Sequence, residues 1–496
     1  MTTVSPEFDI EAETDAPLAE EQALVAAEPV GAVTIEQLLY VAIFAAAAIL
    51  RLVNLGGQPL TPAEAQEALA VWQYWHPVEV TVTAGSPAYF SLTSLVSQLA
   101  GNGDGVMRFI PALAGLGVVL LPLWLRPVIG RPAALISSFF LAISPTLVSS
   151  SRMAGGESLA LFALLLIFAS WVYYKQDGSV RWLYFLSGLF GLGITSGPLF
   201  YGGLVTLAVA WGLNRFIGEP DQERPDLAQA DELADTADVD DADDADNADE
   251  EEQSETVEPT MNTERRNAIL IGAGVAVALG TFFLWNPSGI GGTAALLVSW
   301  LGQFRFDVTA QEWLDPVLAF GRYEAAVLLL GTIGAAWATW NGQNQTANLA
   351  AYWFIGGLIL ILAQAGNIEN VLLLTLPGYL LIGMFVQHLF AQSDKLVEGW
   401  TRWPLAFLLI ILIAIMTKNL GRYARIQQFN ADDASNLGLA VICGLMGFII
   451  IALVFVWDYR AALQGIIIPA LLVFAVLNWG QAWRLGHLAV NDTRER

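Results

Sequence analysis

The sequence predicts an all-α polytopic membrane protein. Hydrophobic residues make up 55% of the 496-residue chain and charged residues only 14%, whereas a soluble domain usually carries about 25% charged residues. Surface-to-volume scaling leaves a soluble fold too little interior for this much apolar surface. Lipid solvates apolar side chains directly, so we expect most of the chain to fold inside a bilayer.

Apolar runs long enough to cross a bilayer recur along the chain. A hydrocarbon core about 30 Å thick needs roughly 17–25 apolar residues in each helix. Thirteen candidate spans lie near 37–56, 108–125, 132–149, 157–174, 182–196, 198–214, 267–285, 322–340, 349–366, 369–390, 403–417, 436–457 and 461–482. The tripeptide Ser196-Gly197-Pro198 is compatible with a turn between two spans or a kink within one.

The net charge of −25 is concentrated in two appendages. Residues 1–36 hold nine acidic residues and no basic one, and residues 219–258 hold nineteen acidic residues and one arginine. Such composition is typical of disordered chain, and an acidic start is unlike a cleaved signal peptide. We therefore predict four parts: a disordered tail 1–36, a transmembrane module 37–217 with an external loop 57–107, a disordered acidic loop 218–264, and a second transmembrane module 265–496.

The distribution of Lys and Arg near span ends predicts the orientation. With a cytoplasmic N-terminus, nine flanking basic residues up to Arg402 lie inside and four lie outside, although the bias fails after Lys418. We predict a multi-pass protein of the cell membrane, with the N-terminus and the acidic loop cytoplasmic. The segments 57–107 and 286–321 then share the external face.

Several classes of chemistry are excluded by the sequence. The single Cys443 rules out an intrachain disulfide and a cysteine metal cluster, no lysine follows a glycine as a P-loop requires, and the three histidines show no zinc pattern. Basic residues do not cluster as in nucleic-acid-binding proteins. We expect membrane lipids as partners, no nucleic acid and no cofactor; a divalent metal and protein partners stay open.

The first external loop carries the most specific local signal. Thr61 is a candidate N-cap, Pro62 suits the first turn and Glu64 closes a capping box, which predicts a helix over 62–75. Trp72 and its aromatic neighbours suit a membrane interface. The same pattern is typical of an interfacial helix that Glu64 only caps. A second helix over 87–100 is too short to cross the bilayer and is expected in the membrane plane.

The order of motifs in the first two hundred residues resembles a known family. A first span ending Leu50-Arg51-Leu52 precedes the acidic helix, and a span beginning Arg108-Phe109-Ile110-Pro111-Ala112-Leu113 follows it. Next come Ser144-Pro145 and the run from Ser151 to Glu157. Together these resemble the GT-C class of membrane glycosyltransferases, in particular its protein mannosyltransferase-like and aminoarabinose-transferase-like members.

The resemblance implies a GT-C-like fold and a specific activity. Such enzymes move a sugar from a polyprenyl-phosphate-linked donor to an acceptor at the external face. An acid in the first loop acts as general base or orients the acceptor, which assigns Glu64 as the catalytic candidate. Arginines bind the carrier phosphate through paired, charge-assisted hydrogen bonds. The candidates for phosphate or substrate binding are Arg108, Arg152, Glu157, Arg305 and Arg322, and those on the acceptor side are Glu67, Tyr74 and His76.

The chain departs from the family pattern at three places. Ala63 stands where the family has its catalytic Asp, Gly155-Gly156 replaces an expected pair, and Ser196 replaces a lysine. Two alternatives therefore stay open: a catalytically inactive relative that binds a lipid-linked glycan or a partner, and a secondary transporter or flippase component. The arginines and aromatic residues are equally typical of interfacial anchors.

Overall fold

A computed structural model describes residues 34–76, 84–217, 258–305, 307–342, 344–391, 407, 411 and 459–487. The chain forms two compact units, residues 1–42 and 43–496. In the first unit the described residues contain the start of helix α2 (Ile35–Leu52). Most of the acidic loop and the expected spans 403–417 and 436–457 lie outside the described residues.

All regular secondary structure in the described part of the second unit is helical. Its first half contains α3 (Pro62–Trp75), α4 (Pro87–Ala100), α5 (Asp104–Met107), α6 (Phe109–Trp124), α7 (Arg126–Ile129), α8 (Arg131–Ile143), α9 (Pro145–Ser151), α10 (Glu157–Asp177), α11 (Val180–Ile194) and α12 (Pro198–Ile217). The second half contains α14 (Glu258–Gly280), α15 (Gly289–Leu301), α16 (Ala310–Tyr323), η1 (Val327–Gly331), α17 (Thr332–Asn341), α18 (Gln345–Ala363), η2 (Ile368–Asn370), α19 (Val371–Ala391) and α22 (Tyr459–His487).

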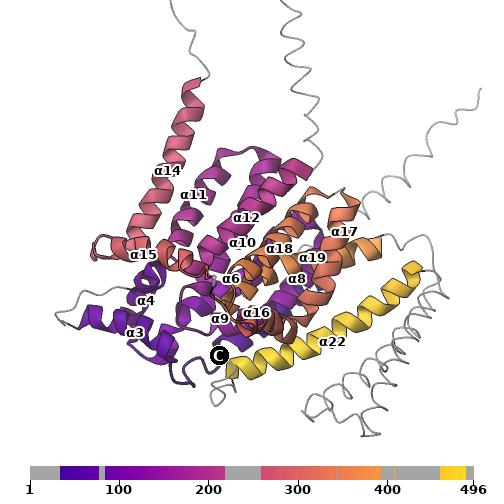
Figure 1. The fold of residues 1–496 in the computed structure, drawn as a ribbon, viewed down its shortest axis with the longest axis horizontal. Helices are drawn as coiled ribbons and strands as arrows, with labels where there is room; N and C mark the ends of the chain where they lie inside the picture. The colour runs from indigo at the N-terminus through magenta and orange to yellow at the C-terminus, as the bar shows by residue number, and fades with distance from the viewer. Residues whose placement is uncertain are drawn as a thin grey trace, which may run out of the picture. The chain divides into compact units, whose positions relative to one another are not determined.

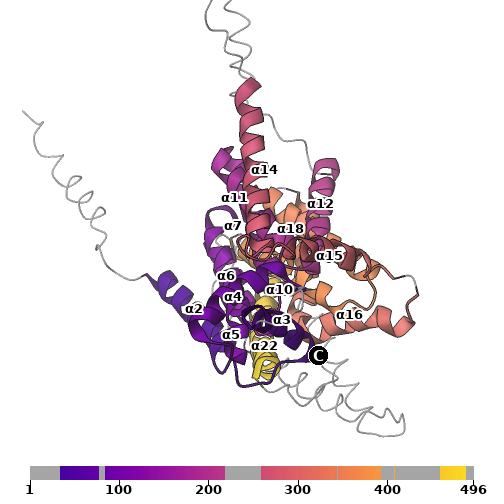
Figure 2. The ribbon, with the colours of Figure 1, turned by 90° about the vertical axis from the view of Figure 1, so that its left-hand side faces the viewer.

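The long helices pack side by side as a bundle, and helices from both predicted transmembrane modules interleave in it. α10 packs against α6, α11 and α12, while α8 packs against α19 and α12 against α18. α3 and α4 lie at one end of this bundle, beside the end of α14, in both views (Figures 1 and 2). We call this the loop end.

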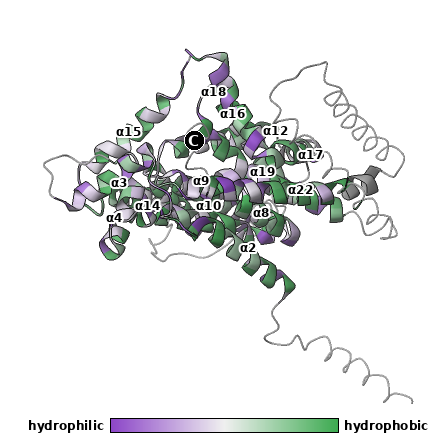
Figure 3. Ribbon diagram, turned by 90° about the horizontal axis from the view of Figure 1, so that it is seen from below, coloured by the Kyte–Doolittle hydropathy of each residue, from purple (hydrophilic) through white to green (hydrophobic). Residues whose placement is uncertain are grey.

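The prediction of a polytopic helical membrane protein is confirmed, but the count of thirteen spans is not. Five helices of the described residues are long and apolar enough to cross a membrane, or up to seven if each of two bent pairs is one span. Hydrophobic residues dominate most of the helical ribbon in Figure 3. The shorter apolar helices, such as α6 and α11, do not reach the length of a full crossing.

Both helices predicted in the first external loop are present with the expected bounds. α3 begins with the predicted capping box, in which Thr61 accepts from the backbone of Glu64 and the Glu64 side chain accepts from the backbone of Thr61. Leu69 and Trp72 are about half exposed on one face of α3, whereas Ala68 and Val71 are buried on the other. The exposed apolar face suits contact with lipid headgroups and acyl chains.

The run 182–214 is two helices, as the predicted spans 182–196 and 198–214 require, and Ser196-Gly197-Pro198 forms the turn between them. Two other boundaries differ from the predicted spans. α14 ends at Gly280, short of the predicted 285, because Phe282, Phe283 and Leu284 all have positive φ and cannot continue a right-handed helix. The predicted span 322–340 starts only at Val327, after the chain bends by 100° between α16 and η1.

Candidate functional site

Glu64 and Arg108 form a buried ion pair, joined by two hydrogen bonds, that fixes the first external loop. Arg108 Nε lies 2.7 Å from Glu64 Oε1, and Arg108 Nη2 lies 3.0 Å from Glu64 Oε2. The side chains are 2% and 4% exposed for Glu64 and Arg108. Glu64 also accepts hydrogen bonds from the backbone and hydroxyl of Thr61 and from the backbone N–H of Ala154. The carboxylate therefore ties α3 to the starts of α6 and α10.

This environment makes Glu64 a strong acid. Burial would raise its pKa, but hydrogen bonds from Arg108, Thr61 and Ala154 and the positive charge of Arg108 outweigh burial and lower the pKa to about 2. A carboxylate that already accepts five hydrogen bonds has little affinity for another proton. In this geometry Glu64 is suited to hold the loop and poorly suited to remove a proton from an acceptor.

Two of the four arginines expected to bind phosphate or substrate, Arg108 and Arg152, are also occupied by the protein. Arg108 donates three further hydrogen bonds, to the backbone oxygens of Leu55, Gln58 and Pro59. Together with Glu64 these use all five guanidinium N–H donors. Arg152 donates to four carbonyls at the end of α2, those of Leu50, Arg51, Val53 and Asn54. Either arginine could bind a phosphate only by releasing backbone carbonyls.

Arg51 follows the same principle and does not act as an interfacial anchor. Its guanidinium is fully buried and donates to the carbonyls of Leu141 and Ala142 at the end of α8. These carbonyls have no partner within the helix because α8 stops there. The arginines around the loop end are therefore used mainly to satisfy helix ends.

Glu67 lies one turn after Glu64 and has the opposite environment. Its Oε2 is buried and has no hydrogen-bond partner among the described residues. Burial, reinforced by the negative charge of Glu157, raises its pKa to about 7, although the backbone N–H groups of Ser86 and Gly85 oppose the rise. A carboxyl group that titrates near neutral pH and has an unpartnered oxygen can accept a proton from a substrate.

Glu67 belongs to a group of three acids that come from distant parts of the chain. Glu157 at the start of α10 raises the pKa of Glu67, and it interacts electrostatically with Glu369 in η2 as well. We call Glu67, Glu157 and Glu369 the acid cluster. Like charges that repel one another are costly, which marks these three acids as candidates for function. No three His, Cys, Asp or Glu side chains in the described ranges are placed to hold a metal ion.

Gly156 allows three loops to meet beside the acid cluster. A Cβ atom at this position would collide with the carbonyl oxygen of Ser196 and the hydroxyl of Ser86. Ser86 in turn donates a hydrogen bond to the Ser196 carbonyl, and the backbone N–H of Ala88 donates to Thr195 O at 2.9 Å. The departure from the family pattern at 155–156 thus has a steric reason, the close approach of the α11–α12 turn.

The chain is similar to known mannosyltransferases and to a crystal structure of ArnT. Residues 84–211 match the dolichyl-phosphate-mannose-protein mannosyltransferase family. The Bacillus subtilis protein YkcB, whose name assigns it to the mannosyltransferases, is 34% identical over 117 residues, which are 23% of this chain and 16% of that protein. The crystal structure of ArnT from Cupriavidus metallidurans bound to undecaprenyl phosphate matches 90% of this chain and 77% of that chain, with 15% identity and a TM-score of 0.50.

The chain has the GT-C fold. This confirms the resemblance drawn from the motifs of the first two hundred residues. The family match contains Arg108, Arg152 and Glu157 but begins after α3, so Glu64 and Glu67 lie outside it. The chain spans only about one sixth of the length of YkcB.

The other site residues that we predicted for this protein lie apart from the Glu64–Arg108 pair. Tyr74 packs edge-on against Trp75, Phe90 and Phe282, and the exposed His76 stacks on Trp72. Their part in acceptor binding stays a prediction.

Arg305 and Arg322 are both exposed, at opposite ends of α16. Arg305 attracts Glu312 electrostatically, and Arg322 lies over the ring of Tyr323. The two arginines are therefore separated by the length of α16 and do not form one phosphate pocket.

Sequence reasoning missed two acidic residues of this protein, Glu369 and Glu324. Glu369 carried no motif, and only its position just before an apolar span could have drawn attention to it. Glu324 is fully buried, and it accepts hydrogen bonds from Ser144, Thr146 and Tyr379 at 2.5–3.2 Å. It thereby connects the α16–η1 bend to the 60° bend between α8 and α9.

Proposed function

We propose that this protein is a membrane glycosyltransferase that moves a sugar from a polyprenyl-phosphate-linked donor to an acceptor at the loop end. The reaction is a substitution at the anomeric carbon. An acceptor hydroxyl oxygen forms a bond to this carbon, the bond between the carbon and the phosphate oxygen breaks, and polyprenyl phosphate leaves. The acceptor proton passes to a carboxylate of the protein.

The observation that carries the proposal is the state of Glu67. Its unpartnered Oε2 lies in the loop that brings α3, α4 and the start of α10 together, and its pKa of about 7 suits a general base at neutral pH. Ala63, the position of the family's catalytic Asp, is four residues earlier, so the two positions share one face of α3. We assign Glu67 as the general base, and Glu64 as the residue that positions α3.

The relatives and the exposed Arg305 support a polyprenyl-phosphate-linked donor. The matching family is named for dolichyl-phosphate mannose, and the ArnT structure contains undecaprenyl phosphate. Arg305 precedes α16, which packs against η2, the element that carries Glu369 of the acid cluster. We assign Arg305 as the contact for the carrier phosphate, with Arg322 at the far end of the same helix as a second candidate.

We propose the cell membrane as the location, with the loop end external and residues 1–36 and 218–264 cytoplasmic. The excess of flanking Lys and Arg on the opposite side supports this orientation. The lipid-linked donor then reaches the acid cluster from the outer leaflet.

The test uses the full chain in detergent micelles with tritiated undecaprenyl-phosphate mannose and a membrane extract as acceptor source. We expect conversion of the donor to undecaprenyl phosphate with transfer of label, and loss of conversion in Glu67→Gln. Glu264→Gln, near the start of α14, is the matched control and should keep wild-type conversion.

Two outcomes separate the alternatives. Donor that raises the thermal stability of the wild-type protein without being converted would identify an inactive relative. A well-folded protein that neither binds nor converts the donor would overturn the proposal.

A further inference from the structure

A pocket lies at the end of α10 remote from the acid cluster. It has a volume of about 770 Å³ and is lined by Leu123, Trp124, Arg126, Pro127, Gly130, Arg131, Tyr173, Asp177 and Trp182. Glu157 and Asp177 mark the two ends of the 21-residue helix α10. At 1.5 Å per residue they are about 30 Å apart along the helix, which is close to the thickness of the bilayer core.

One wall of the pocket is a stack of aromatic rings. Tyr173 and Trp182 are stacked with centroids 4.9 Å apart, and Trp124 lies 5.5 and 5.4 Å from them. The hydroxyl of Tyr173 donates to the carbonyl of Trp124, which fixes α10 to the end of α6. Trp and Tyr at the ends of apolar helices are typical of the headgroup level of a membrane.

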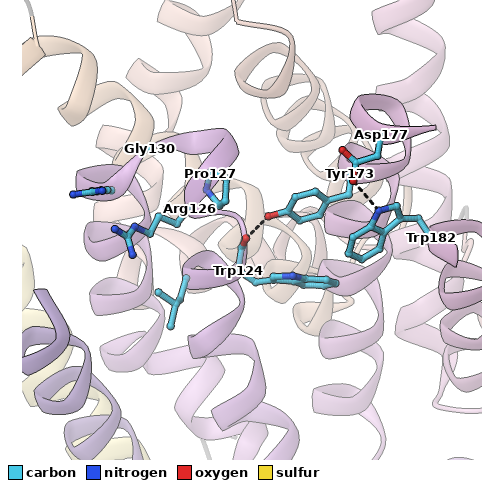
Figure 4. Close-up of a pocket in the computed structure, with 9 residues that line it drawn as sticks. Trp124, Arg126, Pro127, Gly130, Tyr173, Asp177 and Trp182 are labelled. Atoms are coloured by element: carbon cyan, nitrogen blue, oxygen red, sulfur yellow. Dashed lines mark hydrogen bonds between the residues drawn. The ribbon is translucent and has the colours of Figure 1, made fainter. Parts of the chain in front are cut away.

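The opposite wall is basic. Figure 4 shows Arg126 and Gly130 on one side of the pocket and Tyr173, Asp177 and Trp182 on the other, with the guanidinium of Arg126 directed away from the aromatic rings. Arg131, which also lines the pocket, is exposed.

The charge of Asp177 is partly balanced within the protein. Its carboxylate accepts from Trp182 Nε1 at 3.2 Å and lies 3.7 Å from the guanidinium of Arg181. The pocket therefore carries a net positive charge that favours an anion.

We infer that this pocket binds the phosphate group of an anionic phospholipid, in the leaflet opposite the acid cluster. Guanidinium groups from α7 and the start of α8 hydrogen-bond the phosphate oxygens. The aromatic wall covers the glycerol region, and the apolar surface of α6, which includes the 36% exposed Leu123, contacts the acyl chains. A lipid fits better than a soluble phosphate because the pocket opens at the ends of apolar helices.

The test measures lipid retention by the full chain in a non-ionic detergent, using native mass spectrometry with dioleoyl phosphatidylglycerol or dioleoyl phosphatidylcholine. We expect one retained phosphatidylglycerol and weaker retention of the zwitterionic lipid. The double variant Arg126→Gln/Arg131→Gln should lower the apparent affinity for phosphatidylglycerol by about tenfold or more, because hydrogen bonds to charged groups are lost. The single variant R131Q changes an exposed side chain, so its affinity for phosphatidylglycerol is measured instead if the double variant does not fold.

Arg215→Gln is the control, because Arg215 is an exposed arginine at the end of α12 that does not line the pocket. It should retain phosphatidylglycerol as the wild type does. Equal retention of both lipids, or equal loss in the control and the pocket variants, would show an unspecific aromatic belt and overturn the inference. Complete displacement of phosphatidylglycerol by millimolar glycerol phosphate would point to a soluble anion and overturn it as well.

Discussion

Glu64 and Glu67 stand one helical turn apart on α3 and have opposite chemistry. Glu64 accepts five hydrogen bonds, is paired with Arg108, and has a pKa lowered to about 2. Glu67 has an unpartnered buried oxygen and faces the negative charge of Glu157, and its pKa is raised to about 7. Both are acids in the same short helix, so the difference comes from the neighbours that the fold supplies.

The comparison teaches that a conspicuous motif and a reactive group need not be the same residue. The capping box made Glu64 visible in the sequence, and the same capping contacts help to saturate its carboxylate. A fully satisfied carboxylate stabilises a structure, whereas an incompletely satisfied one is available for proton transfer. The two acids of α3 thus divide into a positioning residue, Glu64, and a proposed reactive residue, Glu67.

The largest expected effect tests Glu67, the proposed reactive residue. Glu67→Gln should lower the rate of sugar transfer by about a hundredfold or more, because general bases contribute roughly 10²–10⁴ to rates. The thermal unfolding temperature should stay the same or rise, since a carboxyl group with one buried, unpartnered oxygen is replaced by a neutral amide. The initial rate with tritiated undecaprenyl-phosphate mannose is the measurement. Wild-type rates in this variant would remove Glu67 from the reaction.

The next effect tests Glu64, the positioning residue. Glu64→Gln should lower the free energy of unfolding by about 3–5 kcal/mol, because it leaves the buried guanidinium of Arg108 without its counter-ion. Thermal unfolding in detergent measures the loss, and Asp104→Asn in the same loop is the control. A Glu64→Gln protein as stable as the wild type but inactive would instead make Glu64 the catalytic acid, as the sequence resemblance implied.

The pH dependence should separate the two acids. Transfer should fall about tenfold for each pH unit below 7, since Glu67 must be deprotonated to act as a base. Stability behaves differently at the two positions. The contribution of Glu64 is present above its usual pKa of 4.5 and is lost as the pH falls toward 2. That of Glu67 is present below 4.5 and is lost as the pH rises through 7. Unfolding curves of the wild type and each Gln variant between pH 2 and 8 test both signs.

The smallest effect concerns Gly156, where three loops meet beside the acid cluster. Gly156→Ala should cost about 1–3 kcal/mol, because the added methyl group collides with the carbonyl of Ser196 and the hydroxyl of Ser86. Gly274→Ala in α14 is the matched control, since a Cβ there meets no other atom within 4 Å. Chemical denaturation of the two variants gives the difference. Equal stability would show that the loops can separate without cost.

We could predict the membrane class, the helices 62–75 and 87–100, and the GT-C resemblance from the sequence alone. Hydropathy and capping are local signals, so they can be read from neighbouring residues. The family resemblance implied that Glu64 and an arginine of the loop region matter, and the structure places Glu64 against Arg108.

Only the tertiary structure decided which groups are saturated and which remain available. Arg108 is occupied by carbonyls of the connection between α2 and α3, and Arg152 by carbonyls at the end of α2, all far away in the sequence. Glu369 reaches the acid cluster from more than two hundred residues beyond Glu157. Hydrogen-bond satisfaction depends on which backbone groups other helices leave without partners, and no local pattern records that.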